Sequence, residues 1–316
     1  MPYPRRIVPD KVTRYEYVGK RDESARIDVF LTGRLPTLSR SLIQRFIKEG
    51  RATVNGRVAR ASSKVGRGDR VEIEVPHIIR PKMVPTEMPL DILFEDEHFI
   101  AINKPPGLVM HPSTGHWEDT LVNAVVAHLK IPAEATDIVR PGIVHRLDKD
   151  TSGVIVMGKT NAGLAGLAKQ FRERTIEKEY RAIVYGVVAS DEGEISLPIG
   201  RHRTDAKKMG VARAGTGKEA VSRFRVLQRF AQATYVSVLP ETGRMHQIRV
   251  HLASVGHPCV GDPLYGADRP AVEGMARQAL HAYRLTLTHP ATGGSMTVIA
   301  PLATDMAAVL GQLCQA

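Results

Sequence analysis

The chain has 316 residues, of which 43% are hydrophobic and 24% charged, and it carries a formal net charge of +11. This composition is ordinary for a globular protein, and the length suffices for one large and one small domain. Two cysteines are too few for a disulfide framework or a four-cysteine metal site, and no apolar run is long enough to span a bilayer. We therefore expect a cytoplasmic protein without a membrane partner.

The positive charge is unevenly distributed. Residues 1–88 hold 19 Lys and Arg against 10 Asp and Glu, whereas residues 89–316 hold 25 against 23. Charge concentrated at one end favours a polyanion-binding module joined to a nearly neutral body. A basic solubilising surface is the alternative that composition leaves open.

Residues 1–24 are polar and without clear periodicity, and we expect a loosely docked extension. Residues 25–76 then predict a compact αβ module. A helix begins at Ser39 or Ser41 and ends before Gly50, which is placed as a C-terminal cap. The pair Asn55-Gly56 between β-forming residues predicts a tight type I′ hairpin, and the alternation over 71–75 predicts a half-buried strand.

The predicted helix has a basic face that suits contact with phosphates. An ordinary solvated face fits the helix equally well when it is considered alone. The order of segments 26–31, 39–50 and 54–56 resembles an S4-type RNA-binding domain, and this resemblance favours RNA. The residues expected to contact RNA there are Arg40, Arg45, Lys48 and Arg51.

Residues 77–88 contain Pro81 and Pro85 and predict an extended linker. From residue 89 to 316 strands and helices mix without strict alternation, which favours an α+β domain with a mixed sheet. The expected strands are Phe99–Asn103, Gly153–Gly158, Tyr180–Val184 and Thr234–Leu239. The expected helices are Thr120–Leu129, Ala162–Phe171 and Met245–Ser254.

Four segments of this domain stand out chemically. They are the rigid turn at 103–107, the polar loop His145–Gly153 between two apolar stretches, Lys178-Glu179-Tyr180 at a strand entry, and Thr242–His251 at a helix start. Each segment fits a purely structural role when it is considered alone. An Asp in a loop, such as Asp148, usually stabilises a turn. A metal site is the weaker interpretation of His246 and His251, because a spacing of five suits no helical pair.

Together these segments decide the interpretation. Lys-Pro-x-Gly at 104–107, His-Arg-Leu-Asp-x-x-Thr-Ser-Gly at 145–153, Lys-x-Tyr at 178–180 and Gly-Arg-x-His-Gln-Ile-Arg at 243–249 resemble, in this order, the RluA/RluD-type pseudouridine synthase family. The resemblance implies an S4-like domain followed by a catalytic domain with a mixed, largely antiparallel sheet. It implies no cofactor and no metal, because isomerising uridine adds and removes nothing.

The resemblance also assigns roles. Asp148 is implied as the catalytic carboxylate, Arg249 as its ion-pair partner, Tyr180 as the ring that stacks on a flipped-out uracil, and Arg146 as a group that stabilises that nucleotide. Further RNA contacts are expected from Lys104, His145, Arg244 and a mobile basic loop over 201–218 that carries Arg201, Arg203, Lys207 and Lys208.

The expected substrate is large-subunit ribosomal RNA, within a ribosomal precursor, and the expected state is a monomer. Transfer RNA is an alternative substrate, because base identity is read through pocket and RNA shape. A non-catalytic RNA-binding protein of ribosome assembly is the alternative from another class.

Overall fold

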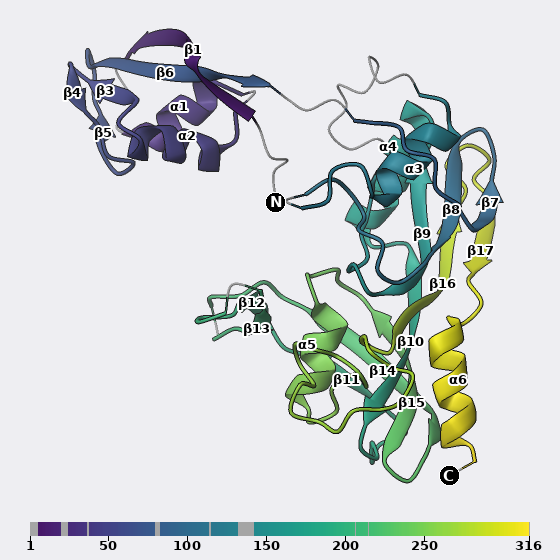
Figure 1. The fold of residues 1–316 in the computed structure, drawn as a ribbon. Helices are drawn as coiled ribbons and strands as arrows, with labels where there is room; N and C mark the ends of the chain where they lie inside the picture. Colours follow the sequence, from purple (N-terminus) through teal and green to yellow (C-terminus); the bar gives the residue numbers. More distant parts are fainter. Residues whose placement is uncertain are drawn as a thin grey trace. The chain divides into compact units, whose positions relative to one another are not determined.

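The computed structural model describes residues 6–19, 25–36, 38–79, 83–113, 115–131, 142–205, 207–213 and 215–315. The chain divides into two compact units, Met1–Pro81 and Lys82–Ala316 (Figure 1). Among the described residues, no helix is long and apolar enough to cross a membrane.

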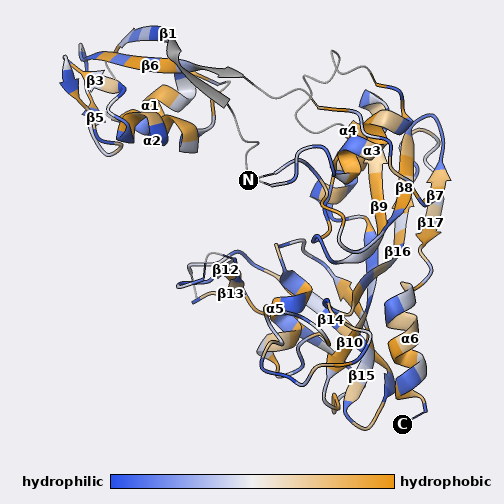
Figure 2. Cartoon of the chain, viewed as in Figure 1, coloured by the Kyte–Doolittle hydropathy of each residue, from blue (hydrophilic) through white to orange (hydrophobic). Residues whose placement is uncertain are grey.

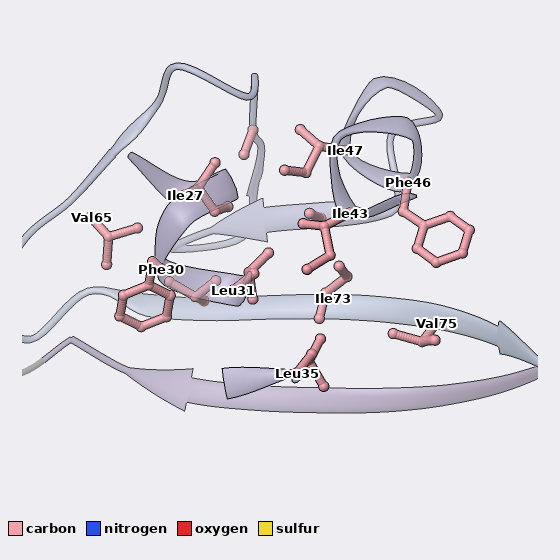
Figure 3. Packing of buried hydrophobic residues seen from close by; sticks show 13 residues of the cluster. Ile27, Phe30, Leu31, Leu35, Ile43, Phe46, Ile47, Val65, Ile73 and Val75 are labelled. Carbon is pink, nitrogen blue, oxygen red and sulfur yellow. The ribbon is translucent and has the colours of Figure 1, made fainter. Parts of the chain in front are cut away.

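The first unit packs two helices on a small antiparallel sheet with the order β1-β6-β3-β4. Its apolar core includes Ile27, Leu31, Ile43, Phe46 and Ile73, which meet between the helices and β6 (Figure 3). The elements are β1 (Arg6–Val18), β2 (Ala25–Arg26), α1 (Ile27–Arg34), α2 (Arg40–Lys48), β3 (Ala52–Val54), β4 (Arg57–Val58), β5 (Lys64–Val65) and β6 (Arg70–Ile79).

Two predictions in this unit are confirmed. The helix begins after Ser39 and is followed by Gly50 with φ 78°. Asn55 and Gly56, with φ 51° and 72°, have the positive values that a type I′ turn requires.

The expected extension over 1–24 differs from the structure, because Arg6–Val18 forms β1 along β6. Cross-strand ion pairs stabilise this pairing, with 2.9 Å between Arg14 and Glu74 and 2.8 Å between Arg70 and Glu16. Their partners lie more than fifty residues apart, so local periodicity could not reveal them. β6 likewise continues to Ile79, into the predicted linker.

The second unit is built on a nine-stranded sheet with the order β11-β14-β15-β10-β16-β9-β8-β7, and β17 pairs with β16 beside β9. Its strands are β7 (Ile92–Glu95), β8 (Phe99–Lys104), β9 (Ser152–Gly158), β10 (Glu177–Tyr185), β11 (Glu192–Ser196), β14 (Val221–Arg229), β15 (Ala233–Pro240), β16 (Leu280–Thr288) and β17 (Ser295–Ile299). A separate hairpin is formed by β12 (Ile199–Arg201) and β13 (Met209–Val211). The helices are α3 (Leu121–His128), α4 (Asn161–Glu173), α5 (Gln247–Ser254) and α6 (Thr304–Leu313).

The sheet of the second unit confirms the expected mixed, largely antiparallel architecture. Among the pairings of the described strands, only β9 with β16 is parallel. β8 and β9 are strongly hydrophobic and almost wholly buried (Figure 2). All seven expected elements are present, with ends that differ by a few residues.

The parallel contact brings the start of β9 against β16. Gly153 has φ 108°, and a Cβ atom there would lie 2.1 Å from the Ala282 carbonyl oxygen, so only glycine fits. The Ser152 hydroxyl and His281 Nδ1 are 2.9 Å apart across the same junction. This close approach fixes the point at which the preceding loop, with Asp148, enters the sheet.

Candidate active site

Asp148 lies in the short loop that leads into β9. The Thr151 N–H donates to the Asp148 carbonyl oxygen at 3.1 Å, and Lys104 Nζ donates to the carbonyl oxygen of Lys149 at 2.8 Å. Leu147 is buried on the other side. The loop is therefore held on both sides of Asp148, whose side chain remains 17% exposed.

The expected ion pair between Asp148 and Arg249 is present. Arg249 Nη1 donates to Asp148 Oδ2 at 3.0 Å. The same guanidinium donates through Nε and Nη2 to both oxygens of Asp262, at 2.7 and 2.8 Å. Burial alone would raise the pKa of Asp262, but the bonds from Arg249 outweigh it and hold that pKa below its usual range. One arginine thus bridges two carboxylates, of which only Asp148 reaches solvent.

Gln247 fixes the turn before α5, the helix that carries Arg249. Its side-chain oxygen accepts from the Thr242 hydroxyl at 2.7 Å and from the Arg244 N–H at 3.0 Å. Its amide nitrogen donates to the Val221 carbonyl oxygen at 2.9 Å. The start of α5 is therefore tied to β14, and Arg249 projects from the first turn of a helix whose position is set by buried hydrogen bonds.

Asp148, Arg249 and Tyr180 line one pocket of about 100 Å³, together with Arg146 and apolar side chains such as Leu147 and Ile248. Tyr180 comes from β10, where it lies between Val238 on β15 and Ala282 on β16. Burial raises the pKa of its phenol, and the charge of Asp148 raises it further, so the hydroxyl stays protonated. The pocket combines a carboxylate, a neutral aromatic ring and apolar lining residues.

His246 lies against the same carboxylate. Its Nε2 is 3.9 Å from Asp148 Oδ2, and its Nδ1 is 2.9 Å from the Tyr265 hydroxyl. Its backbone adopts φ 56°, a left-handed conformation that costs a non-glycine residue about 1 kcal/mol. Burial lowers the pKa of His246, although the charge of Asp148 opposes this effect.

Lys104 was expected to contact RNA, but the structure places it in the interior of the protein. Its side chain is fully buried, and Nζ donates to the carbonyl oxygens of Pro105, Leu108 and Lys149 at 2.7, 3.0 and 2.8 Å. All three N–H groups of an ammonium are used inside the protein. Burial lowers its pKa to about 7. Lys104 joins the turn after β8 to the loop of Asp148.

His145 is tied to the protein, and its expected contact with RNA stays a prediction. Its Nε2 accepts a hydrogen bond from the Val156 N–H at 3.0 Å, and its ring stacks on Phe171 with 4.3 Å between centroids. Burial lowers the pKa of His145 to about 3, and the nearby charge of Lys178 lowers it further. The imidazole is therefore neutral at physiological pH and holds the loop to β9, rather than offering a cation to phosphate.

The remaining residues expected to bind RNA lie on the surface or at its edge. Arg244 lines the pocket and donates through Nε to the Glu219 carbonyl oxygen at 2.9 Å. Within the basic segment 201–218, Arg201 ends β12, and Arg203, Lys207 and Lys208 lie in the connection between β12 and β13. Arg201, Arg203 and Lys207 are exposed, whereas Lys208 is half-buried. The expectation of a mobile loop over the RNA stays a prediction.

In the first unit Lys48 is exposed, while the other three cations of the predicted RNA face are held by carboxylates. Arg40 pairs with Asp28, and Arg45 and Arg51 pair with Glu49. RNA contact by these residues remains a prediction.

Comparison with known proteins decides the family. Residues 98–254 match the family model of RNA pseudouridylate synthases, and residues 25–71 match that of S4 domains. The chain is 44% identical over 279 residues to an RNA pseudouridine synthase of Synechocystis, covering 88% of this chain and 85% of that protein. This chain belongs to the RNA pseudouridylate synthase family. The enzyme is a pseudouridine synthase with an N-terminal S4 domain.

Two further relatives agree with this assignment. The enzyme is 42% identical to ribosomal large subunit pseudouridine synthase D of Neisseria meningitidis, over 91% of this chain and 78% of that protein. A solved structure, human RNA pseudouridylate synthase domain containing 4, superposes with a TM-score of 0.55 at 27% identity, over 71% of this chain and 92% of that chain.

Sequence reasoning about this synthase gave Asp262 and Tyr265 no role. Both lie in the segment 261–266, which follows the four segments on which the resemblance is based. One signal was available: Asp262 is an acidic residue enclosed between Gly261 and Pro263, where a tight turn buries it. Its partner is thirteen residues away, so no local pattern joined the two.

Proposed function

We propose that this synthase converts uridines of large-subunit ribosomal RNA to pseudouridine, and that Asp148 is the carboxylate that acts on the reacting nucleotide. The observation that carries the proposal is the arrangement around Asp148. It is the partly exposed member of the Arg249 bridge, and it faces the pocket that Tyr180 also lines. The ribosomal substrate is supported by the S4 match and by the relatives named as large-subunit synthases.

The reaction breaks the bond between C1′ and N1, turns the uracil and joins C1′ to C5, and the proton of C5 leaves as N1 gains one. Asp148 can attack C1′, add to C6 or remove a sugar proton, and each route needs an ionised carboxylate. Arg249 supplies the opposite charge that favours this ionised form. Tyr180 stacks on the turned base, an interaction worth about 1–3 kcal/mol. Arg146, at the exposed side of the pocket, holds the flipped-out nucleotide.

The proposal is tested with Asp148→Asn and RNA labelled with tritium at C5 of uridine. We expect tritium release from ribosomal RNA to disappear while RNA binding is retained, because the substitution removes the charge and keeps the shape. Asp150→Asn makes the same change two residues away and is expected to remain active. Undiminished release by Asp148→Asn contradicts the role of this residue, and preferential release from transfer RNA contradicts the substrate.

A further inference from the structure

A second hollow, of about 520 Å³, adjoins the catalytic pocket. The two share Arg146, Tyr180, Pro240 and the turn 242–244 as lining. Beyond these, the hollow extends to the C-terminal end of α4 and the start of β10. Its cationic side chains come from the loop before β9, from α4 and its cap, from β10 and from the turn before α5; they are Arg146, Arg172, Arg174, Lys178 and Arg244.

The positive charge of this hollow is not neutralised by the protein. Within the described part of the chain, Arg146, Arg172, Arg174 and Lys178 make no ion pair or side-chain hydrogen bond, and Arg244 bonds only to a carbonyl oxygen. The carboxylate in the lining, Glu241, already pairs with Arg223 at 2.8 Å. Arg146, Arg172 and Arg174 are exposed, whereas Lys178 and Arg244 are half-buried.

Like charges in this hollow repel one another. Burial lowers the pKa of Lys178, and the charge of Arg174 lowers it further. The charge of Lys178 in turn acts on His145, which burial already keeps neutral. A bound anion would relieve this repulsion, because it neutralises several cations at once.

The C-terminal end of α4 accounts for two of these cations, but not for Lys178. Arg172, in the last turn of α4, is favoured by the helix dipole. Arg174 caps the helix with φ 60° and ψ 31°, a left-handed conformation in which glycine is the usual residue. Lys178 lies on a strand and is half-buried. The charge of Lys178 therefore has no role at the helix end.

We propose that this hollow binds the phosphodiester backbone of the RNA strand that flanks the target uridine. The inference rests on the proposed function, and it adds Arg172, Arg174 and Lys178 as phosphate contacts outside the catalytic pocket. RNA is favoured because the hollow runs directly into that pocket through Arg146 and Arg244, so that one strand can occupy both. Phosphate contacts of this kind fix register without reading sequence.

The test combines Arg172→Gln with Arg174→Gly in the full-length enzyme. Glycine removes the charge of Arg174 and suits its backbone, so the melting temperature is expected to stay equal or rise. The KM for RNA is expected to rise about tenfold or more, with a far smaller change in kcat. The dependence of binding on salt is expected to weaken, by a slope of about 0.7 for each lost contact with single-stranded RNA.

Lys169→Gln is the matched control, because it removes one charge from the same helix at a residue outside the hollow. It is expected to leave KM and the salt slope unchanged. A double variant with unaltered KM and salt slope overturns the proposal that the hollow binds phosphates. So does an equal loss of affinity in Lys169→Gln, which would indicate a general effect of charge.

RNA with neutral methylphosphonate links beside the target uridine provides a second measurement. Wild-type enzyme is expected to bind it more weakly than native RNA, whereas the double variant is expected to bind both alike. A similar penalty in both enzymes contradicts the assignment. RNA binding by the Asp148→Asn variant measures the phosphate contacts of the hollow without the reaction. If wild-type enzyme forms no pseudouridine in ribosomal RNA, the proposed function fails. The salt dependence of binding still tests the phosphate contacts in that case.

Discussion

Among single residues, Arg249 has the most constrained surroundings in the site. Its Nε and Nη2 are engaged by the fully buried Asp262, which leaves Nη1 for Asp148. Asp262 is itself fixed, because its Oδ1 accepts from the N–H groups of Leu264 and Tyr265 at 2.9 and 3.1 Å. The guanidinium is thereby oriented before any substrate arrives, which is how a site avoids reorganising during the reaction.

Asp262→Asn is therefore expected to lower kcat by about 10²-fold, because a small displacement of Arg249 alters the position and charge balance of Asp148. The KM for RNA is expected to change little, since Asp262 is buried. Steady-state kinetics on ribosomal RNA measures both constants.

Asp96→Asn is the control for this substitution. It also removes a carboxylate from a close pair, with His289 at 2.6 Å, but outside the pocket. Asp262→Asn with normal kcat would show that Asp148 needs no such support.

The roles of some site residues could be predicted from the sequence, whereas those of others could not. Asp148, Arg249 and Tyr180 were predicted through motif resemblance, and the structure brings them into one pocket. Lys104 was expected to contact RNA because a lysine in a turn resembles a solvent-facing cation, but the structure buries it. Two of the carbonyl oxygens that surround it belong to the turn after β8, but the third, of Lys149, is 45 residues away, and no local pattern predicts that they converge.

Among the elements, the β12–β13 hairpin packs on Val250 of α5 and is hydrogen-bonded to the site through the Tyr265 hydroxyl. Tyr265 Oη donates to the Met209 carbonyl oxygen at 3.1 Å and accepts from the Met209 N–H at 2.9 Å. The same oxygen is 2.9 Å from His246 Nδ1, and His246 lies beside Asp148. The hairpin carries several basic side chains, so the hydroxyl couples a surface element to the catalytic loop.

Tyr265→Phe is expected to release the hairpin while keeping the packing of the ring. The Met209 amide should exchange its hydrogen at least tenfold faster, because hydrogen bonds worth about 1 kcal/mol each are lost. Hydrogen exchange measured by NMR checks this.

Tyr185→Phe makes the same change at a hydroxyl that donates to the Pro270 carbonyl oxygen at 2.7 Å, and Met209 should be unaffected there. Equal protection of Met209 in Tyr265→Phe and wild type would refute the coupling.

Elements with strong periodicity were predictable, and those formed by long-range pairing were not. The helix at 161–173 and the strand at 152–158 followed from local apolar patterns. Residues 6–18 show no clear periodicity in the sequence, and β1 depends on partners in β6. The strands of the β12–β13 hairpin are only three residues long, and the hairpin depends on Tyr265. Tertiary contacts decide such segments.

At the scale of the whole molecule, each unit contains a buried carboxylate that stabilises it only when ionised. In the first unit Asp28 is fully buried and bound by Gln44, Arg26 and Arg40, with the shortest contact 2.6 Å from Gln44. Burial alone would raise its pKa, but these bonds lower it far below its usual range. Asp262 has the corresponding place in the second unit.

The sign of the pH dependence follows from these depressed values. An unfolded aspartate has a pKa of about 3.9. Near this pH the aspartates of the unfolded state bind protons, whereas Asp28 and Asp262 of the folded state stay ionised. The stabilisation is complete well above that pH and is lost as the pH falls through and below it. Both units are therefore expected to lose stability between about pH 5 and pH 2.

Asp28→Asn is expected to destabilise the first unit by about 3 kcal/mol at neutral pH and to flatten its response to acid. Urea titrations read by hydrogen exchange in residues 25–79 and 83–315 separate the two units. The second unit is the internal control and should keep its wild-type midpoint. An equal fall in both midpoints would show that the units unfold as one.

The parallel contact between β9 and β16 has a consequence for synthesis on the ribosome. β9 acquires this neighbour from His281 and Ala282, which follow Ser152 by almost 130 residues. At about 5–20 residues per second, roughly 10 s pass between translation of these two segments. Throughout that interval the start of β9 lacks this neighbour, and other chains can pair with its open edge. We therefore expect the enzyme to be prone to aggregation while its C-terminal part is being synthesised.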